Sequence, residues 1–360
     1  MLRKSPPKVS VLMPVHNGEQ FLKLSVNSIL EQSFSNLELI MLDDGSTDHT
    51  IDILREFATG DDRIVLLKNE KRYGVARSLN RCAAEAQGIF FARMDSDDKA
   101  HTNRLARQLF EFEKYPDLVV CGSNVIYADS KMRPLYRSNF PISDQDIKRS
   151  SVFLNPFAHS AVMMRASAFR SAGGYSENFS EDFDVAQDYD LWCRLIWRRR
   201  AGNIDDSLMT LRRHRHSVSL IRRSTQNAAA SQIQAEYANQ LLGPSRFGVS
   251  QFENIRAHQT WGIKKTDQIK ETAAEAILDV SELIHLVDLE MGNPPNNQAW
   301  DSILGRCLLS LFRPPFQLKK LLAVSRLIKS YPISPFRGSL TLVRQFMVAN
   351  FMRIFWKFIS

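Results

Sequence analysis

The segment "GIFFARMDSDDK" (residues 88–99) places a run of mostly apolar residues directly before three aspartates in four positions. Its first half has the length and composition of a buried β-strand, so the acids begin where that strand ends. Like charges ~4 Å apart repel each other by about 4 kcal/mol at an effective dielectric of 20. The sequence therefore predicts a strand that ends in a loop whose acidic cluster is compensated by a cation.

Segments of similar character occur before and after this one. Apolar runs of strand length occupy residues 9–14, 37–42, 63–68, 88–94 and 117–127. Segments with apolar residues at spacings of three and four, typical of helices, occupy residues 19–32, 48–58, 74–87 and 103–115. This alternation predicts an α/β fold with a mostly parallel sheet flanked by helices, and ligands bind such sheets at the carboxyl ends of the strands.

Composition limits the class of protein. The chain has 360 residues, 44% hydrophobic and 24% charged, which is ordinary for a globular protein. Its four cysteines lie far apart and form no CxxC pair, so neither a zinc site nor a disulfide framework is expected, and a reducing cytoplasm fits best. The N-terminal segment is basic but has no apolar core or cleavage site of a secretory signal, so none is expected.

Charge and pattern divide the chain into three expected parts: a catalytic domain over residues 1–225, a helical segment over 226–292 and a basic, apolar tail over 293–360. The tail holds ten Lys or Arg residues and one acid, and basic residues interrupt every long apolar run. It is therefore expected to lie on an anionic membrane surface rather than to span a bilayer, with a helix that docks on another protein as the alternative. No nucleic-acid-binding signature accompanies the positive charge.

Four motifs occur in a fixed order: "VSVLMPVHNGEQFL" (9–22), "LDDGSTD" (42–48), "ARMDSDD" (92–98), and "NPFAHSAVMM", "GGY" and "AQDYDLWCRL" between residues 155 and 195. Together they resemble the family 2 glycosyltransferases, inverting enzymes of the GT-A fold that build bacterial surface polysaccharides. The resemblance covers about residues 8–220. It implies a GT-A fold with a C-terminal helical extension, and transfer of a sugar from a nucleotide-sugar to a hydroxyl of a glycan or lipid-linked glycan.

The resemblance also implies a metal site in the acidic segment. Asp95 and Asp97, with Asp98, would hold Mn²⁺ or Mg²⁺, which in turn neutralises the diphosphate of the donor; hard cations of this kind prefer oxygen ligands. The later segment "LRRHRHSVS" (211–219) offers His214 as a further ligand or a phosphate donor. The alternative is that the aspartates only form a turn and cap a helix.

For the donor, the resemblance implies that Asp44 accepts a hydrogen bond from the uracil imide and that Arg77 holds the nucleotide or its phosphates, as a guanidinium can do bidentately. A UDP-sugar is the first expectation, with dTDP and GDP open, because His16 stands where a tyrosine is more usual. The donor-binding residues implied in this way are Pro14, Val15, His16, Asn17, Asp43, Asp44, Arg77, Asp95 and Arg212.

An inverting transfer needs one carboxylate to remove the proton of the acceptor hydroxyl. The resemblance assigns this general base to Asp188, before "Y-x-L-W", with Gln187 where an acid is usual; the alternative is an aspartate that only complements a helix dipole. His159 and the "GGY" turn at 173–175 would shape the acceptor side or pack in the core. The enzyme would sit peripherally on the inner face of the cell membrane. A nucleotidyltransferase of similar fold and a non-catalytic nucleotide-sugar-binding protein are the competing functions.

Overall fold

The computed structural model describes residues 6–177, 186–214, 223–242 and 247–253. The chain divides into two compact units, Met1–Ala229 and Ala230–Ser360. The helix α9 (Arg223–Leu242) covers the beginning of the segment expected to be helical, residues 226–292. The expected segments from residue 254 onward, including the basic tail, lie outside the described residues.

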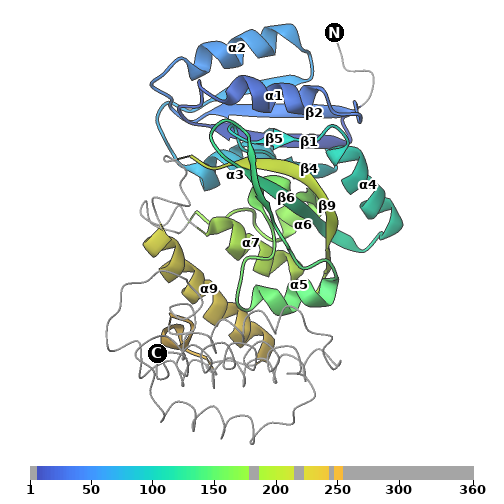
Figure 1. Cartoon of the computed structure of the whole chain (residues 1–360), viewed down its shortest axis with the longest axis vertical. Coiled ribbons are helices and arrows are strands. Elements are labelled where there is room, and N and C mark those ends of the chain that lie inside the picture. Colours follow the sequence, from blue (N-terminus) through green and yellow to red (C-terminus); the bar gives the residue numbers. More distant parts are fainter. Residues whose placement is uncertain (1–5, 178–185, 215–222, 243–246, 254–360) are drawn as a thin grey trace, which may run out of the picture. The chain divides into compact units, whose positions relative to one another are not determined.

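Within the described residues, nine strands form one sheet in the order β3-β2-β1-β4-β8-β6-β9-β5, with β7 paired to β6 (Figure 1). The pairings make β1, β2, β3, β4, β6 and β9 run in one direction and β5, β7 and β8 in the other. This confirms the predicted α/β fold with a mostly parallel sheet. The strands are β1 (Val9–Val15), β2 (Leu37–Asp43), β3 (Ile64–Lys68), β4 (Phe90–Arg93), β5 (Lys99–Ala100), β6 (Leu118–Ala128), β7 (Pro134–Arg137), β8 (Met163–Arg165) and β9 (Arg200–Arg212).

Helices cover both faces of the sheet. Along β4, successive side chains point to opposite faces, so Phe90 and Ala92 join the core that contains Leu22 and Leu105, from α1 and α4. Phe91 faces the other way and packs edge-on against Phe169 of α6, with ring centroids 5.5 Å apart. The helices of this unit are α1 (Leu22–Leu30), α2 (Thr50–Gly60), α3 (Val75–Glu85), α4 (Arg104–Lys114), α5 (Asp144–Ser151), α6 (Ala166–Ser171) and α7 (Gln187–Ile196), with a 3₁₀ turn, η1 (His159–Ala161).

The loops that follow β1 and β2 are fastened to each other by side-chain hydrogen bonds. Asn17 Oδ1 accepts from the Thr47 backbone N–H at 2.8 Å, and the Asn17 N–H donates to Ser46 Oγ at 3.0 Å. Gly45 has φ +67°, and a Cβ there would lie 2.6 Å from the Arg72 backbone N, so only glycine fits this turn. The two loops therefore form one rigid edge at the carboxyl ends of their strands.

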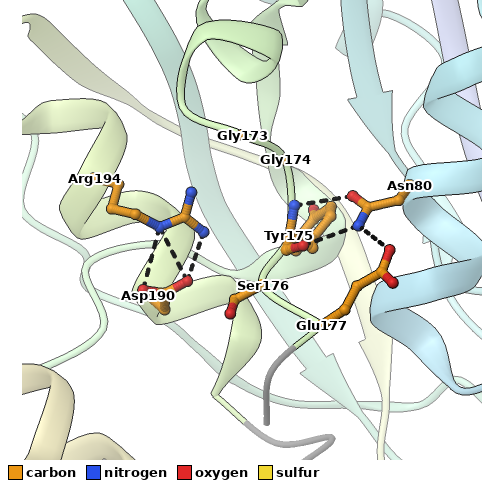
Figure 2. A pocket seen from close by; sticks show the side chains of 8 residues that line it. All are labelled: Asn80, Gly173, Gly174, Tyr175, Ser176, Glu177, Asp190 and Arg194. Atoms are coloured by element: carbon orange, nitrogen blue, oxygen red, sulfur yellow. Dashed lines mark hydrogen bonds and ion pairs between the residues drawn. The ribbon is translucent and has the colours of Figure 1, made fainter.

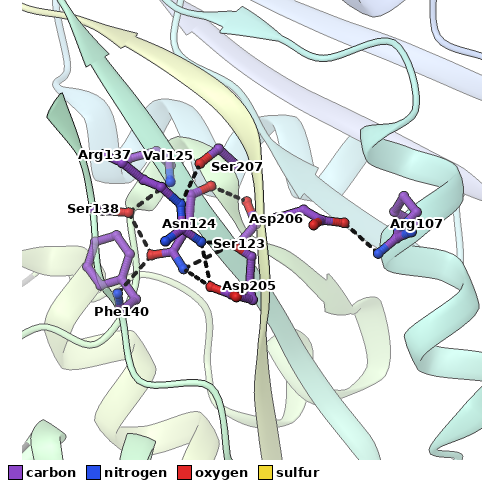
Figure 3. Close-up of polar contacts among 10 residues, drawn as sticks. All are labelled: Arg107, Ser123, Asn124, Val125, Arg137, Ser138, Phe140, Asp205, Asp206 and Ser207. Carbon is purple, nitrogen blue, oxygen red and sulfur yellow. Dashed lines mark hydrogen bonds and ion pairs between the residues drawn. The ribbon is translucent and has the colours of Figure 1, made fainter. Parts of the chain in front are cut away.

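A polar network fixes the β6, β7 and β9 region (Figure 3). Asn124 Oδ1 accepts from Ser138 Oγ and from the Phe140 N–H, both at 2.8 Å, while its Nδ2 donates to Asp205 Oδ1 at 3.1 Å. Arg137 pairs with the same carboxylate. The register between β6 and β9 shifts beside Asn124. The network satisfies the polar groups at this irregularity, so β9 continues in register toward the site at its end.

Among the described residues, no helix has the length and apolar character needed to cross a bilayer.

Candidate active site

The acidic loop (residues 94–98) follows β4 at the carboxyl end of the parallel strands and carries Asp95, Asp97 and Asp98. Asp95 is held from two sides. Its Oδ1 lies 2.5 Å from Arg93 Nη1, and its Oδ2 accepts a hydrogen bond from Ser160 of η1. Burial raises the pKa of Asp95, but the positive charge of Arg93 and the hydrogen bonds outweigh burial and lower it below the ordinary value.

The end of β9 closes over this loop. His214 Nε2 lies 2.9 Å from Asp97 Oδ2, and the Arg212 backbone N–H donates to Asp98 Oδ1 at 2.9 Å. Phe21, just before α1, packs against the His214 ring, with centroids 5.2 Å apart. The structure thus brings together His214, Arg212 and the three aspartates that the sequence analysis grouped.

Asp98 is the inner member of the loop. It is 4% exposed, and its Oδ2 lies 2.6 Å from Ser160 Oγ. Burial, with the charges of Asp97 and Asp95, raises its pKa well above the ordinary value. Because a serine hydroxyl carries one proton, Ser160 can donate to only one of its two carboxyl neighbours.

These contacts decide which side chains fit a divalent cation. Within the described residues, no group of three or more His, Cys, Asp or Glu side chains is arranged as a metal cage. Mg²⁺ is often held by only one or two carboxylates with substrate phosphates, so a complete protein cage is not required. The side chains of Asp95 and Asp97 are 38% and 31% exposed, so these two carboxylates are open to a cation that also binds substrate phosphates. Asp98 does not fit, because its buried carboxyl is taken up by protein donors.

The carboxylate of Asp44 organises the loop before α3. It accepts hydrogen bonds from Asn69 Nδ2 at 2.7 Å, from the Tyr73 N–H at 2.8 Å and from the Gly74 N–H at 2.9 Å. A carboxylate has about four acceptor positions, so these three hydrogen bonds leave one position unused on the buried Asp44 carboxylate. His16 Nδ1 lies 2.9 Å from the Asp44 backbone oxygen, which keeps the imidazole at this edge.

The other residues expected around the nucleobase differ in whether their side chains are exposed to a ligand. Val15 is part of the hydrophobic core, so its side chain is directed away from the site. Asp43 is buried, and its Oδ1 accepts from the Ser46 N–H at 3.1 Å. Pro14 is partly exposed at the end of β1, and Asn17 is exposed. Val15 and Asp43 therefore shape the loop rather than present side chains to a ligand.

Both arginines expected to bind the donor are engaged with protein groups. The side chain of Arg77 is 56% exposed, and its Nε lies 3.6 Å from Glu177 Oε2. Arg212 donates from Nε to the Asp97 backbone oxygen at 2.9 Å and from Nη1 to the Ser130 backbone oxygen. In this structure Arg212 fastens the acidic loop to the end of β9.

Asp188 lies in the first turn of α7. Its Oδ2 accepts a hydrogen bond from Asn155 Nδ2 at 2.7 Å, and the helix begins after Ala186, which adopts a left-handed conformation with φ +69°. Burial raises the pKa of Asp188, and the hydrogen bond from Asn155 opposes that rise. A raised pKa brings a carboxylate closer to the range useful to a general base.

Comparison with known proteins identifies the family. The model of glycosyl transferase family 2 matches residues 10–173. The Bacillus subtilis protein named "Putative glycosyltransferase EpsE" is 36% identical over 210 residues, which are 58% of this chain and 74% of that protein. The chain belongs to glycosyltransferase family 2. An uncharacterized glycosyltransferase of Haemophilus influenzae is 27% identical over 273 residues, 73% of this chain and 83% of that one.

A solved structure also matches this family 2 chain. The crystal structure of S. aureus TarS 1–349 in complex with UDP-GlcNAc aligns with a TM-score of 0.55 at 17% identity, covering 94% of this chain and 92% of that one. At this identity the match supports the GT-A fold alone. Membership of family 2 and the named relatives show that this protein is a glycosyltransferase. The nucleotidyltransferase and non-catalytic alternatives are therefore not supported.

A cavity of about 400 Å³ adjoins the other side of α7 (Figure 2). Asp190 pairs with Arg194 at 2.5 Å, and Asn80 joins the backbone of Tyr175 to the carboxylate of Glu177. Asp190 lies about 200° around the helix from Asp188, so the two carboxylates leave α7 on different sides. Its lining residues are Asn80, Gly173, Gly174, Tyr175, Ser176, Glu177, Asp190 and Arg194.

Sequence patterns did not single out Arg93, Ser160 or Asn155, although all three contact the acids of this family 2 site. For Arg93 a signal existed, because an arginine inside an apolar strand and two positions before an aspartate must bury its charge near that acid. Ser160 and Asn155 lie in the motif "NPFAHSAVMM", but nothing local links either residue to its acid, which is more than 30 positions away.

Proposed function

We propose that this glycosyltransferase moves a sugar from a nucleotide-sugar to a hydroxyl of a glycan or lipid-linked glycan and inverts the anomeric centre as it does so. A UDP-sugar is the first choice of donor. The observation that carries the proposal is the convergence of three motifs at one end of the sheet. The acidic loop contacts His214 and Arg212, and residues 155–160 join it to Asp188, because Asn155 donates to Asp188 and Ser160 donates to Asp95.

Asp188 would take the proton of the acceptor hydroxyl as that oxygen attacks the anomeric carbon from the face opposite the diphosphate. Asn155 fixes one oxygen of the Asp188 carboxylate at 2.7 Å, so the other can be turned toward the acceptor. One carboxylate is enough, since an inverting reaction forms no covalent glycosyl-enzyme.

Asp95, Asp97 and His214 would hold Mn²⁺ or Mg²⁺ at the donor side. When bound, the cation supplies Lewis-acid stabilisation of the leaving diphosphate. The protein's own part is to orient these ligands: Arg93 and Ser160 fix Asp95, and Arg212 fixes the backbone of the loop. The choice of UDP is supported by the remaining acceptor position on Asp44 and by the UDP-GlcNAc complex of TarS.

The test is a panel of UDP-, dTDP- and GDP-sugars, read as nucleotide released with and without glycan acceptors. We expect release with a UDP-sugar, its loss in EDTA and its return with Mn²⁺ or Mg²⁺. Transfer that continues undiminished in excess chelator would overturn the metal assignment. Activity with GDP-sugars only would overturn the choice of uracil as the nucleobase.

We also propose that residues 293–360 bind the protein peripherally to the inner face of the cell membrane, on the basis of their ten basic residues and one acid. Flotation of the full chain and of a truncation after Gly292 with anionic vesicles, at low and high salt, tests this. Equal binding by both chains would favour the docking-helix alternative.

A further inference from the structure

The hairpin of β6 and β7 carries an arginine stacked on two tyrosines. Tyr127 and Tyr136 lie directly opposite each other in the antiparallel pairing of these strands, with ring centroids 4.7 Å apart and an angle of 31° between the rings. The guanidinium of Arg213, the residue after β9, lies over both rings, with its central carbon 4.6 Å and 5.4 Å from their centroids. These three residues form the Arg213 stack. Stacking of this kind fixes the plane of a guanidinium and leaves its N–H groups free to bind a ligand.

The charge of Arg213 has no acidic partner among the described residues. Arg213 is exposed, and within these residues its guanidinium forms neither an ion pair nor a hydrogen bond. The other arginines of the hairpin are paired, Arg133 with Asp129 and Arg137 with Asp205. The two phenol hydroxyls of the stack also form no hydrogen bond in the part of the chain that the structure describes. The stack therefore offers a positive charge and unused hydrogen-bond donors, which together suit an anion.

The Arg213 stack is fastened beside the proposed donor site. Arg213 stands between Arg212 and His214 in the chain, and both neighbours contact the acidic loop, Arg212 through its backbone N–H and His214 through its ring. Arg212 also donates from Nη1 to a backbone oxygen in the turn of the hairpin. Because consecutive Cα atoms lie about 3.8 Å apart, the backbone of Arg213 is within a few ångströms of residues that hold the acidic loop. A molecule bound at the stack would therefore lie near the site where transfer is proposed.

Apolar surface adjoins this charge. Leu135 and Tyr136, which are consecutive residues of β7, are 56% and 48% exposed. A small soluble anion gains nothing from apolar surface beside its site, whereas a phosphate attached to a hydrocarbon chain can bury part of that chain there. Phosphate also matches the planar fork of a guanidinium, which can donate two parallel hydrogen bonds to it. The arrangement therefore favours a phosphate that is carried by a lipid.

We propose that the Arg213 stack binds a phosphate group carried by a lipid. This lipid is either the carrier of the glycan acceptor, in which case the inference rests on the proposed function, or a phospholipid of the membrane surface, in which case it does not. Both present the same chemistry, a phosphate ester next to a hydrocarbon chain. In either case the contact belongs to the catalytic domain and does not depend on the basic tail, residues 293–360.

The first experiment measures flotation of the full chain with phosphatidylcholine vesicles that contain dihexadecyl phosphate. Arg213→Gln removes both the charge and the fork, and Arg213→Lys keeps the charge without the fork. Arg133→Gln is the matched control, because it removes the same charge from the same hairpin, but from an arginine that is already paired with Asp129. Tm is measured for each variant, to confirm that it is folded.

Loss of one basic residue near an anionic surface lowers binding about 5-fold through charge alone, which sets the limit expected for Arg133→Gln. We expect Arg213→Gln to weaken vesicle binding about 10-fold or more, because charge-assisted hydrogen bonds are lost as well. Arg213→Lys should also bind more weakly than wild type, since an ammonium lacks the planar fork. Equal binding by Arg213→Gln and Arg133→Gln, or wild-type binding by Arg213→Lys, would overturn the inference, because charge alone would then explain the attachment.

A second experiment distinguishes the two lipids. Transfer is measured without vesicles to one glycan in two forms, with and without an alkyl phosphate at its reducing end. If the phosphate is that of the acceptor, Arg213→Gln should raise the KM of the phosphorylated form about 10-fold and leave the KM of the free glycan and of the donor unchanged. If it belongs to a membrane phospholipid, both acceptor KM values should stay as in wild type while vesicle binding falls. A wild-type chain that transfers to no acceptor would contradict the proposed function instead, and the vesicle result would still decide the role of the Arg213 stack.

Discussion

His214 Nε2 and Asp97 Oδ2 lie 2.9 Å apart although 117 positions separate the two residues in the chain. The contact joins the residue just after β9 to the loop after β4, and it exists because β6 and β9 run parallel to β4 and end at the same edge of the sheet. A pair of this kind can bind a cation together, or the imidazole can donate to a phosphate beside the carboxylate.

Substitution of His214 by Gln separates these two roles. If His214 is a metal ligand, the Mn²⁺ concentration that gives half-maximal activity should rise about 10-fold or more, with the donor affinity at saturating Mn²⁺ little changed. If it is a phosphate donor, the apparent affinity for donor should fall while the Mn²⁺ dependence stays as in wild type. His101→Gln is the control, because the His101 ring lies 3.2 Å from Thr210 Oγ1 of β9 and, among the described residues, forms no hydrogen bond to a residue of the proposed site.

Asp188→Asn should leave the fold and donor binding intact and lower kcat by about 10²-fold or more, the scale expected for loss of a general base. The fold should survive because an amide oxygen can still accept from Asn155. The matched control is Asp190→Asn, two positions along the same helix, where the carboxylate pairs with Arg194. Measurements are nucleotide release with acceptor, donor binding by calorimetry and Tm. A large loss of kcat in Asp190→Asn with near-normal Asp188→Asn would reverse the assignment.

Asp44→Asn should destabilise the protein as well as weaken donor binding. The new amide nitrogen is itself a donor, so it would face either the Gly74 N–H or the two groups that now donate to Oδ1. A buried hydrogen bond to a charged group is worth about 1.5–3 kcal/mol. Urea unfolding measures this loss. Asp43→Asn should lose less, because its single bond from Ser46 can be kept by the amide oxygen. If Asp44→Asn were fully stable and failed only in donor binding, the role of Asp44 would be limited to binding the nucleobase of the donor.

The longest periodic elements could be predicted from the sequence, because local spacing alone defines them. Strands β1 to β4 and helices α1 to α4 lie within a few residues of the expected segments. The short strands β5, β7 and β8 have two to four residues and owe their conformation to antiparallel partners, which lie far along the chain for β5 and β8 and in the preceding strand, β6, for β7. β9 escaped prediction although it has 13 residues, since Asp205 and Asp206 interrupt its apolar pattern.

In the candidate site, the sequence could locate the acidic residues but could not assign a separate role to each of them. The sequence treats Asp95, Asp97 and Asp98 alike, whereas burial and the Ser160 contact set Asp98 apart from the other two. In the same way, the partners of Asp44 are mostly backbone N–H groups some 29 positions later, which every sequence possesses. Roles of this kind depend on long-range geometry, and no local pattern encodes it.

Stability below neutral pH should depend on His159. Burial, with the charge of Arg93, holds the pKa of this histidine well below its ordinary value, so the unfolded chain binds a proton there that the folded chain does not. The free energy of unfolding therefore falls as pH drops below about 6.5, with a slope of up to about 1.4 kcal/mol per pH unit from this group.

His159→Gln removes the titrating group and should flatten that part of the curve of unfolding free energy against pH, measured by urea unfolding between pH 7 and pH 5. Tyr175→Phe is the matched control. The Tyr175 hydroxyl lies 2.9 Å from His159 Nε2, so the variant loses the same contact but keeps the imidazole. It should lower stability by a similar amount at every pH and leave the slope steep. If both variants kept the wild-type slope, another group would be responsible for the acid sensitivity. His159 would then only pack against Tyr175.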